Sequence, residues 1–188
     1  MGESQLQFED PASVRTLLFV AAMAALGFVL GSIAVPVYPN VHFTFGEVAI
    51  FIAGATTGPL YGFIVGFVTI VYTGLVIWGE ITVPFGYGFA GSVMAIASKK
   101  IKAGRLTFII AALVATWVFR IPYNIVTEYY VSGYPWELIW AIQFKTFFQG
   151  LANAIIAYAV LKIPGIGKYI PVCYDSVPGR ILLEKGNL

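Results

Sequence analysis

Charged residues are scarce in this sequence, at 11% of its 188 residues. A soluble domain carries about 25%, which it needs to cover its water-facing surface. Hydrophobic residues make up 59%, and the mean hydropathy is +0.85. The composition therefore predicts an all-α integral membrane protein, with residues 1–188 forming a single membrane domain.

Cysteine and histidine are almost absent, and the motifs of common enzymes are missing. The single cysteine, Cys173, excludes an internal disulfide, and the single histidine, His42, has no second metal-type ligand nearby. There is no G-x-x-x-x-G-K-[ST], H-E-x-x-H or G-x-S-x-G motif. The net charge is +2, and the basic residues form no patch. We therefore expect no enzyme activity, no metal, no cofactor bound by the chain and no nucleic-acid partner.

Long apolar segments are what the sequence has in place of charge. A perpendicular helix needs about 20 residues to cross a membrane. The second and fourth of six segments are shorter, so we expect them to be tilted, broken or shielded by neighbouring helices. The six-helix bundle of residues 14–161 consists of 14–34, 46–57, 60–78, 83–98, 106–123 or slightly beyond, and 136–161, between an N-terminal segment 1–13 and a tail 162–188.

The distribution of basic residues predicts the orientation of these segments. With six crossings, nine of the eleven lysines and arginines fall on one side of the membrane. The loops on the other side contain none. By the positive-inside rule, both termini are cytoplasmic in a multi-pass protein of the plasma membrane. The nine residues are Arg15, Lys99, Lys100, Lys102, Arg105, Lys162, Lys168, Arg180 and Lys185.

Arg120 and Lys145 are the two remaining cations, and both lie inside apolar segments. A charge at membrane depth costs at least about 2.5–3.5 kcal/mol, so each needs compensation. One interpretation is structural: Arg120 pairs with Glu47 or Glu128, and Lys145 extends to the outer interface. The other is a cavity open to the outside that receives an anionic or strongly hydrogen-bonding solute.

Polar residues share helix faces with these two cations. Asn124 lies one turn beyond Arg120, while Lys145, Gln149 and Asn153 follow an i, i+4, i+8 spacing along one face. Such a stripe must face protein, water or ligand rather than lipid.

The first outer loop, residues 35–45, contains two prolines and several aromatic residues, including Tyr38. It either covers a pocket that opens outward or anchors the chain at the interface. In the first segment, Ala21 and Ala25 lie on a different face from the small residues Ala24 and Gly27. Small residues permit close helix contact in lipid, so the second face indicates either a helical partner or further internal packing.

Residues 43–66 read Phe-Thr-Phe-Gly-Glu-Val-Ala-Ile-Phe-Ile-Ala-Gly-Ala-Thr-Thr-Gly-Pro-Leu-Tyr-Gly-Phe-Ile-Val-Gly. This stretch resembles the short second helix, Gly-Pro-x-x-Gly turn and glycine-rich third helix of S components. These are the substrate-binding subunits of energy-coupling factor (ECF) vitamin importers. The run Ala-Ala-Met-Ala-Ala at 21–25 is similar to the Ala-x-x-x-Ala surface with which their first helix meets the coupling protein. Chain length and six segments also match.

The resemblance implies capture of a vitamin from outside, in association with membrane lipid, a membrane coupling protein and two ATPase subunits that use ATP. The partner interface would include Ala21 and Ala25. Two cations favour a vitamin that carries a carboxylate, such as folate, because a guanidinium binds that group bidentately. Riboflavin is second, since the spacing from Glu47 to Gly58, and Lys145 in an amide-bearing sixth segment, resemble riboflavin-type members. The candidate substrate-binding residues are Arg120, Asn124, Lys145, Gln149, Asn153, Tyr38, His42, Glu47 and Tyr87.

Two other classes remain open from the sequence. An intramembrane lipid-binding or lipid-modifying protein would use Arg120 and Lys145 to hold a lipid phosphate. A small structural or channel subunit would bind no small molecule tightly.

Overall fold

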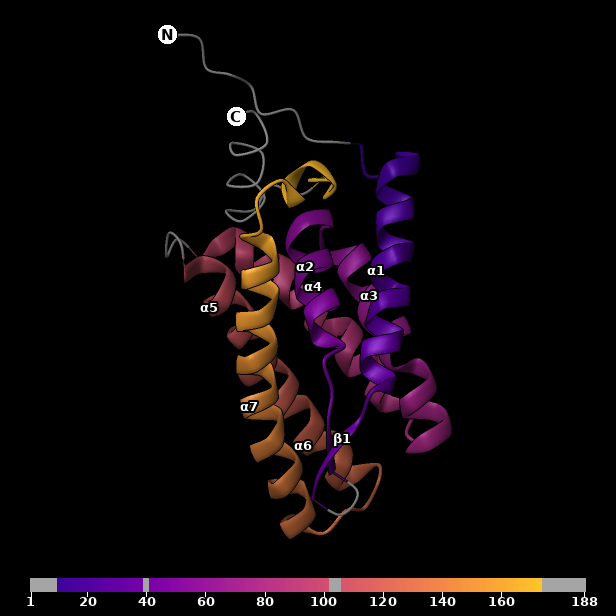
Figure 1. Ribbon diagram of the computed structural model, residues 1–188. Coiled ribbons are helices and arrows are strands. Elements are labelled where there is room, and N and C mark those ends of the chain that lie inside the picture. The colour runs from indigo at the N-terminus through magenta and orange to yellow at the C-terminus, as the bar shows by residue number, and fades with distance from the viewer. Residues whose placement is uncertain (1–9, 39–40, 102–105, 174–188) are drawn as a thin grey trace, which may run out of the picture.

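The computed structural model describes residues 10–38, 41–101 and 106–173 (Figure 1). This part of the chain is mostly helical, with one two-stranded sheet. The α-helices are α1 (Val14–Ser32), α2 (Glu47–Thr57), α3 (Pro59–Tyr72), α4 (Thr82–Lys100), α5 (Thr107–Leu113), α6 (Ile121–Tyr130) and α7 (Trp136–Leu161). The remaining elements are strands β1 (Val35–Tyr38) and β2 (Val41–Phe43), π-helical segments η1 (Thr73–Ile77) and η3 (Val114–Arg120), and the 3-10 turn η4 (Ile166–Lys168).

The helices agree with most of the predicted segments. The α7 helix has the predicted bounds, and α3 continues through η1 as the third segment. The fourth segment is longer than predicted, because α4 runs unbroken for 19 residues and ends in Lys99 and Lys100, which suit the negative end of a helix. The expectation of a short or broken fourth segment is therefore wrong. The fifth segment, α5–η3–α6, continues to Tyr130, seven residues past Tyr123, where the segment was predicted to end or to extend slightly.

Four helical stretches of the described chain have the length and composition of membrane spans. They are Val14–Ser32, Pro59–Val76, Thr107–Tyr130 and Trp136–Leu161. The protein is therefore a multi-pass membrane protein. In Figure 1 the start of α1 and the end of α7 lie at the same end of the bundle, as in any arrangement with an even number of crossings.

The short apolar helix α2 lies in the centre of the bundle. All eleven of its residues are buried, and it contacts α1, α3, α4 and α7. Protein rather than lipid surrounds its ends, so their backbone groups can be satisfied without the helix crossing the full bilayer. The second segment is thus short because its neighbours shield it, which was one of the predicted alternatives.

The first outer loop forms a β-hairpin, which the prediction of an all-α fold missed. β1 pairs antiparallel with β2, with Val35 opposite Phe43 and Pro36 opposite His42. A proline is tolerated in a two-stranded ribbon, because each strand has an edge that needs no donor. β2 contacts α7, at the opposite end of the bundle from η4 (Figure 1).

Helices α3 and α4 pack closely through glycines. A Cβ atom added to Gly91 would lie 2.1 Å from the carbonyl oxygen of Gly62, and one added to Gly66 would lie 2.2 Å from the carbonyl oxygen of Tyr87. Only glycine fits such backbone contact, which gives helices in lipid close van der Waals packing.

Helix α1 presents one small-residue face to the bundle and another outward. Ala24 and Gly27 are buried, and a Cβ on Gly27 would collide with Thr69 of α3. Ala21 and Ala25 are exposed. Of the two predicted faces, the one with Ala24 and Gly27 therefore packs inside the bundle. The one with Ala21 and Ala25 is left exposed within the described chain.

The described part of the tail closes the end of the bundle opposite the hairpin. Ile170 and Val172 are buried in the apolar core beside residues of α2, α4 and α5. The backbone N–H of Cys173 donates to the carbonyl of Thr56, at the end of α2. This end of the bundle is therefore filled by side chains.

Candidate functional site

Arg120 forms a buried ion pair with Glu47. Both side chains are 2% exposed, and Gln149 donates a second hydrogen bond to the same carboxylate oxygen. Arg120 also donates to the Tyr87 hydroxyl at 2.8 Å, and its guanidinium carbon lies 3.9 Å from the centre of that ring. Of the two predicted partners, Arg120 thus uses Glu47 rather than Glu128.

The amides of the predicted stripe hold the segment that follows the hairpin. The Gln149 carbonyl accepts from the Thr44 backbone N–H at 3.2 Å, and Asn153 donates to the Thr44 carbonyl at 3.0 Å. Gln149 and Asn153 are fully buried. These contacts fix the start of α2 against α7, so Glu47 arrives opposite Arg120.

The π-helical segment η3 places Arg120 at its last position. Pro122 follows in the first turn of α6. A proline lacks the N–H of a helical bond and its ring collides with the carbonyl four residues earlier, here that of Val118. The wider π-turn accommodates both effects, and such turns are frequent at functional sites.

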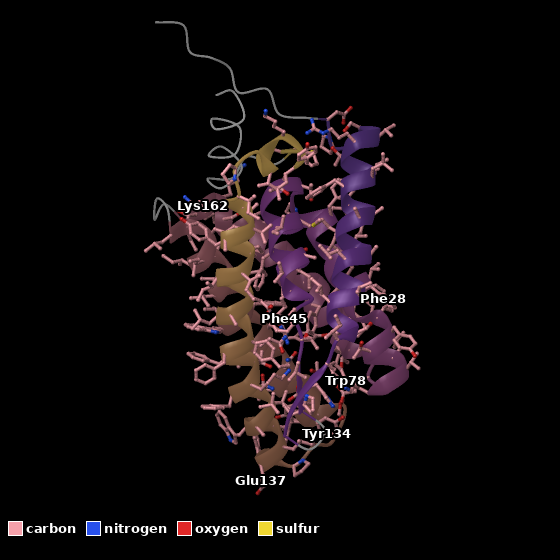
Figure 2. All side chains as sticks on the ribbon, viewed as in Figure 1. Phe28, Phe45, Trp78, Tyr134, Glu137 and Lys162 are labelled. Atoms are coloured by element: carbon pink, nitrogen blue, oxygen red, sulfur yellow. The ribbon has the colours of Figure 1, made fainter. Side chains whose placement is uncertain are left out.

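A cavity of about 340 Å³ lies between the hairpin, the η1–α4 connection, α4, α6 and α7. Small-molecule sites have volumes of about 300–1,000 Å³, so the cavity suits a compact ligand. Trp78 and Tyr134, which line it, lie toward the hairpin end of the bundle, far from Lys162 (Figure 2). The lining residues are Val41, His42, Trp78, Glu80, Val83, Tyr87, Arg120, Asn124, Glu128, Tyr134, Leu138, Ile142, Lys145 and Thr146.

The cavity brings together five of the nine predicted substrate-binding residues: Arg120, Asn124, Lys145, His42 and Tyr87. Glu47, Gln149 and Asn153 lie outside the lining and make the internal contacts described above. The side chain of Tyr38 falls outside the described part of the structure.

Lys145 differs from Arg120 in having no fixed partner. Its side chain is half-buried and lines the cavity, and within the described residues it makes neither an ion pair nor a side-chain hydrogen bond. The charged groups that act on it are Arg120, Glu47 and Glu128. Thr146, next to it, is fully buried with no hydrogen-bond partner for its hydroxyl. These groups can serve a ligand in the cavity.

Two carboxylates, Glu80 and Glu128, also line the cavity. The Tyr134 hydroxyl donates to Glu80, and Gln143 donates to Glu128 at 2.8 Å. The backbone N–H of Tyr134 donates to the Glu128 carbonyl at 3.0 Å. Burial, together with the neighbouring Glu80 carboxylate, raises the pKa of Tyr134, so its hydroxyl remains a donor at neutral pH. The sequence did not identify this pair as part of a site.

Apolar and aromatic residues complete the lining and were also missed. Leu138 and Ile142 precede Lys145 by seven and three residues, which places all three on one face of α7. Extending the stripe from Lys145 toward the start of the helix would have found them. Trp78 follows η1 by one residue and has no comparable spacing in the sequence.

A membrane-embedded helical bundle with a small, partly polar cavity at one end is the arrangement of a subunit that binds a small molecule. No cluster of three potential metal ligands occurs among the described residues. The family described as ECF-type riboflavin transporter, S component, matches residues 11–165, and the chain belongs to this family. No curated protein sequence matches the chain.

Family membership defines the general activity. The chain is a vitamin-binding subunit of an ECF importer, is not an enzyme, and acts in a complex with ECF coupling and ATPase subunits. The predicted resemblance is thereby confirmed. The alternatives of a lipid-modifying protein and of a structural or channel subunit are wrong.

Proposed function

We propose that the chain binds riboflavin in the cavity between the hairpin, α4, α6 and α7. The observation that carries this proposal is the difference between the two cations. Arg120 is neutralised by Glu47, so Lys145 is the one lining cation without an ion pair in the described structure. The expected preference for a carboxylate-bearing vitamin assumed that both cations are available to the ligand. Because Arg120 is paired with Glu47, we favour the second choice, riboflavin.

The chemistry of riboflavin fits the lining. Its flat tricyclic ring needs apolar and aromatic walls, which Trp78, Tyr87 and Ile142 supply. The carbonyl and nitrogen acceptors of the ring need donors, and Lys145 and Asn124 provide them. The hydroxyls of its side chain can donate to carboxylates at the hairpin end of the cavity. Riboflavin carries no net charge, so it needs no second cation.

For the transport cycle, we propose that six crossings place both termini in the cytoplasm and the cavity toward the outside. The exposed face of α1 with Ala21 and Ala25 would contact the coupling protein. The partner ATPases would use ATP, and the chain itself would bind no cofactor.

The test is a titration of purified protein with riboflavin, followed by quenching of flavin fluorescence. Lys145→Met should weaken binding by about 10- to 100-fold, because a hydrogen bond from a charged group contributes about 1.5–3 kcal/mol. The variant should remain folded, since it leaves no partner unpaired. The control is Lys100→Met, which removes an exposed lysine at the end of α4. Absence of riboflavin binding, with tight binding of another vitamin, would overturn the proposal.

A further inference from the structure

We infer that Glu80 and Glu128 select the uncharged flavin and exclude its 5′-phosphate ester. This inference rests on the proposed riboflavin site and assigns a specificity role to two residues of its lining. It follows from the balance of charge around the cavity, from the free acceptors of the two carboxylates, and from their position relative to Lys145.

The site has more carboxylates than cations. Its cations are Arg120 and Lys145, and its carboxylates are Glu80, Glu128 and Glu47, the last through its pair with Arg120. When all of them are ionised, two positive and three negative groups give a formal charge of −1. A phosphate monoester adds about −1.5 to −2 at neutral pH. Such a ligand would therefore increase an existing excess of negative charge.

Hydrogen bonding favours the uncharged ligand for the same reason. An ionised carboxylate only accepts hydrogen bonds and has about four lone-pair positions. Tyr134 and Gln143 are the side-chain donors to Glu80 and Glu128, which leaves acceptor positions on both. The hydroxyls of the flavin side chain can donate to these positions. A phosphate dianion is acceptor-only and offers them nothing.

The two carboxylates share the cavity with Lys145, and both belong to elements at its hairpin end. Glu128 is two residues from the end of α6, and Glu80 belongs to the connection between η1 and α4. Lys145 is nine residues after Trp136, the start of α7, or about 14 Å along the helix at 1.5 Å per residue. In the proposed pose the ring lies beside Lys145, and its side chain, with any phosphate on it, extends toward the carboxylates.

Burial makes the repulsion strong. Glu128 is only 5% exposed, so water and salt screen its charge poorly whenever it is ionised. We expect like charges brought together in a site of this kind to weaken binding on the order of 100-fold, which is about 2.7 kcal/mol.

The experiment compares dissociation constants for riboflavin and riboflavin 5′-phosphate in the wild type, Glu80→Gln, Glu128→Gln and the double variant. The wild type should bind the phosphate ester about 100-fold more weakly. In the double variant the ratio should fall below about 10-fold, mainly because the phosphate ester binds more tightly. The control, Glu137→Gln, removes an exposed carboxylate from the first turn of α7 and should leave the ratio unchanged.

Equal binding of both flavins by the wild type, or an unchanged ratio in the double variant, would overturn the inference while leaving riboflavin binding intact. If the wild type binds neither flavin, the proposed function fails and the inference with it. If Glu128→Gln does not fold, the Glu80→Gln variant alone tests the inference, since Glu80 lies in a connection between helices. The ratio of the two dissociation constants should then be smaller in Glu80→Gln than in the wild type. An unchanged ratio would refute the role of the carboxylates.

Discussion

Removing one partner of the buried Arg120–Glu47 pair should destabilise the protein severely. Glu47→Gln keeps the shape of the side chain but leaves the guanidinium without its counter-charge at 2% exposure. It also places an amide donor against the donors of Arg120 and Gln149. Breaking a buried pair in this way costs about 3–5 kcal/mol. We therefore expect the free energy of unfolding to fall by about that amount.

A double-mutant cycle separates this effect from loss of shape. Arg120→Met should be similarly damaging, because it leaves Glu47 buried and unpaired. The combined variant should cost much less than the sum of the two, since replacing a whole buried pair by uncharged groups is often close to neutral. The measurement is denaturant unfolding in detergent micelles, followed by tryptophan fluorescence. A loss below about 1 kcal/mol for Glu47→Gln, or strict additivity in the cycle, would refute the reasoning.

Two other substitutions test the packing and the partner surface. Gly66→Ala should lower the free energy of unfolding by about 1–3 kcal/mol. The new Cβ would lie 2.2 Å from the Tyr87 carbonyl oxygen and force α3 and α4 apart. An unchanged denaturant unfolding curve would contradict the close contact. Ala21→Leu combined with Ala25→Leu should abolish co-purification with the coupling and ATPase subunits, because both side chains are exposed on a small-residue face. Riboflavin binding should stay within about twofold, since neither residue lines the cavity. Retained assembly would show that the complex uses another surface.

Much of the helical framework could be predicted from hydropathy, and the misses have physical causes. The end of α6 was placed too early because Asn124, Thr127 and Glu128 end the apolar run. These residues continue the helix toward a cavity and a polar loop rather than toward lipid. The hairpin was missed because residues 35–45, with two prolines, were interpreted only as a pocket cover or an interface anchor, whereas a two-stranded ribbon tolerates proline.

Only part of the candidate site could be predicted, and the cause differs from that for the helices. The cost of a buried charge drew attention to Arg120 and Lys145, which both line the cavity, but the sequence could not decide between an internal pair and a ligand. Glu47 is 73 residues from Arg120, and only the fold shows that they meet. Gln149 lies on the same face of α7 as Lys145, one helical turn further along. At that depth its amide binds Thr44 and does not line the cavity. Spacing identifies a face of a helix, while depth along it depends on the neighbouring elements.

The closed end of the bundle determines how a bound molecule can reach the other side of the membrane. Beyond the cavity, the described chain is filled by a core that includes Phe51, Met94 and Phe108, each at most 2% exposed, and Val172 covers its end. A ligand bound in the proposed site would be separated from the far end of the bundle by this core. We therefore expect delivery across the bilayer to depend on a reorientation of the subunit rather than on a passage through its centre. Such a carrier would offer ions no continuous path through the described core.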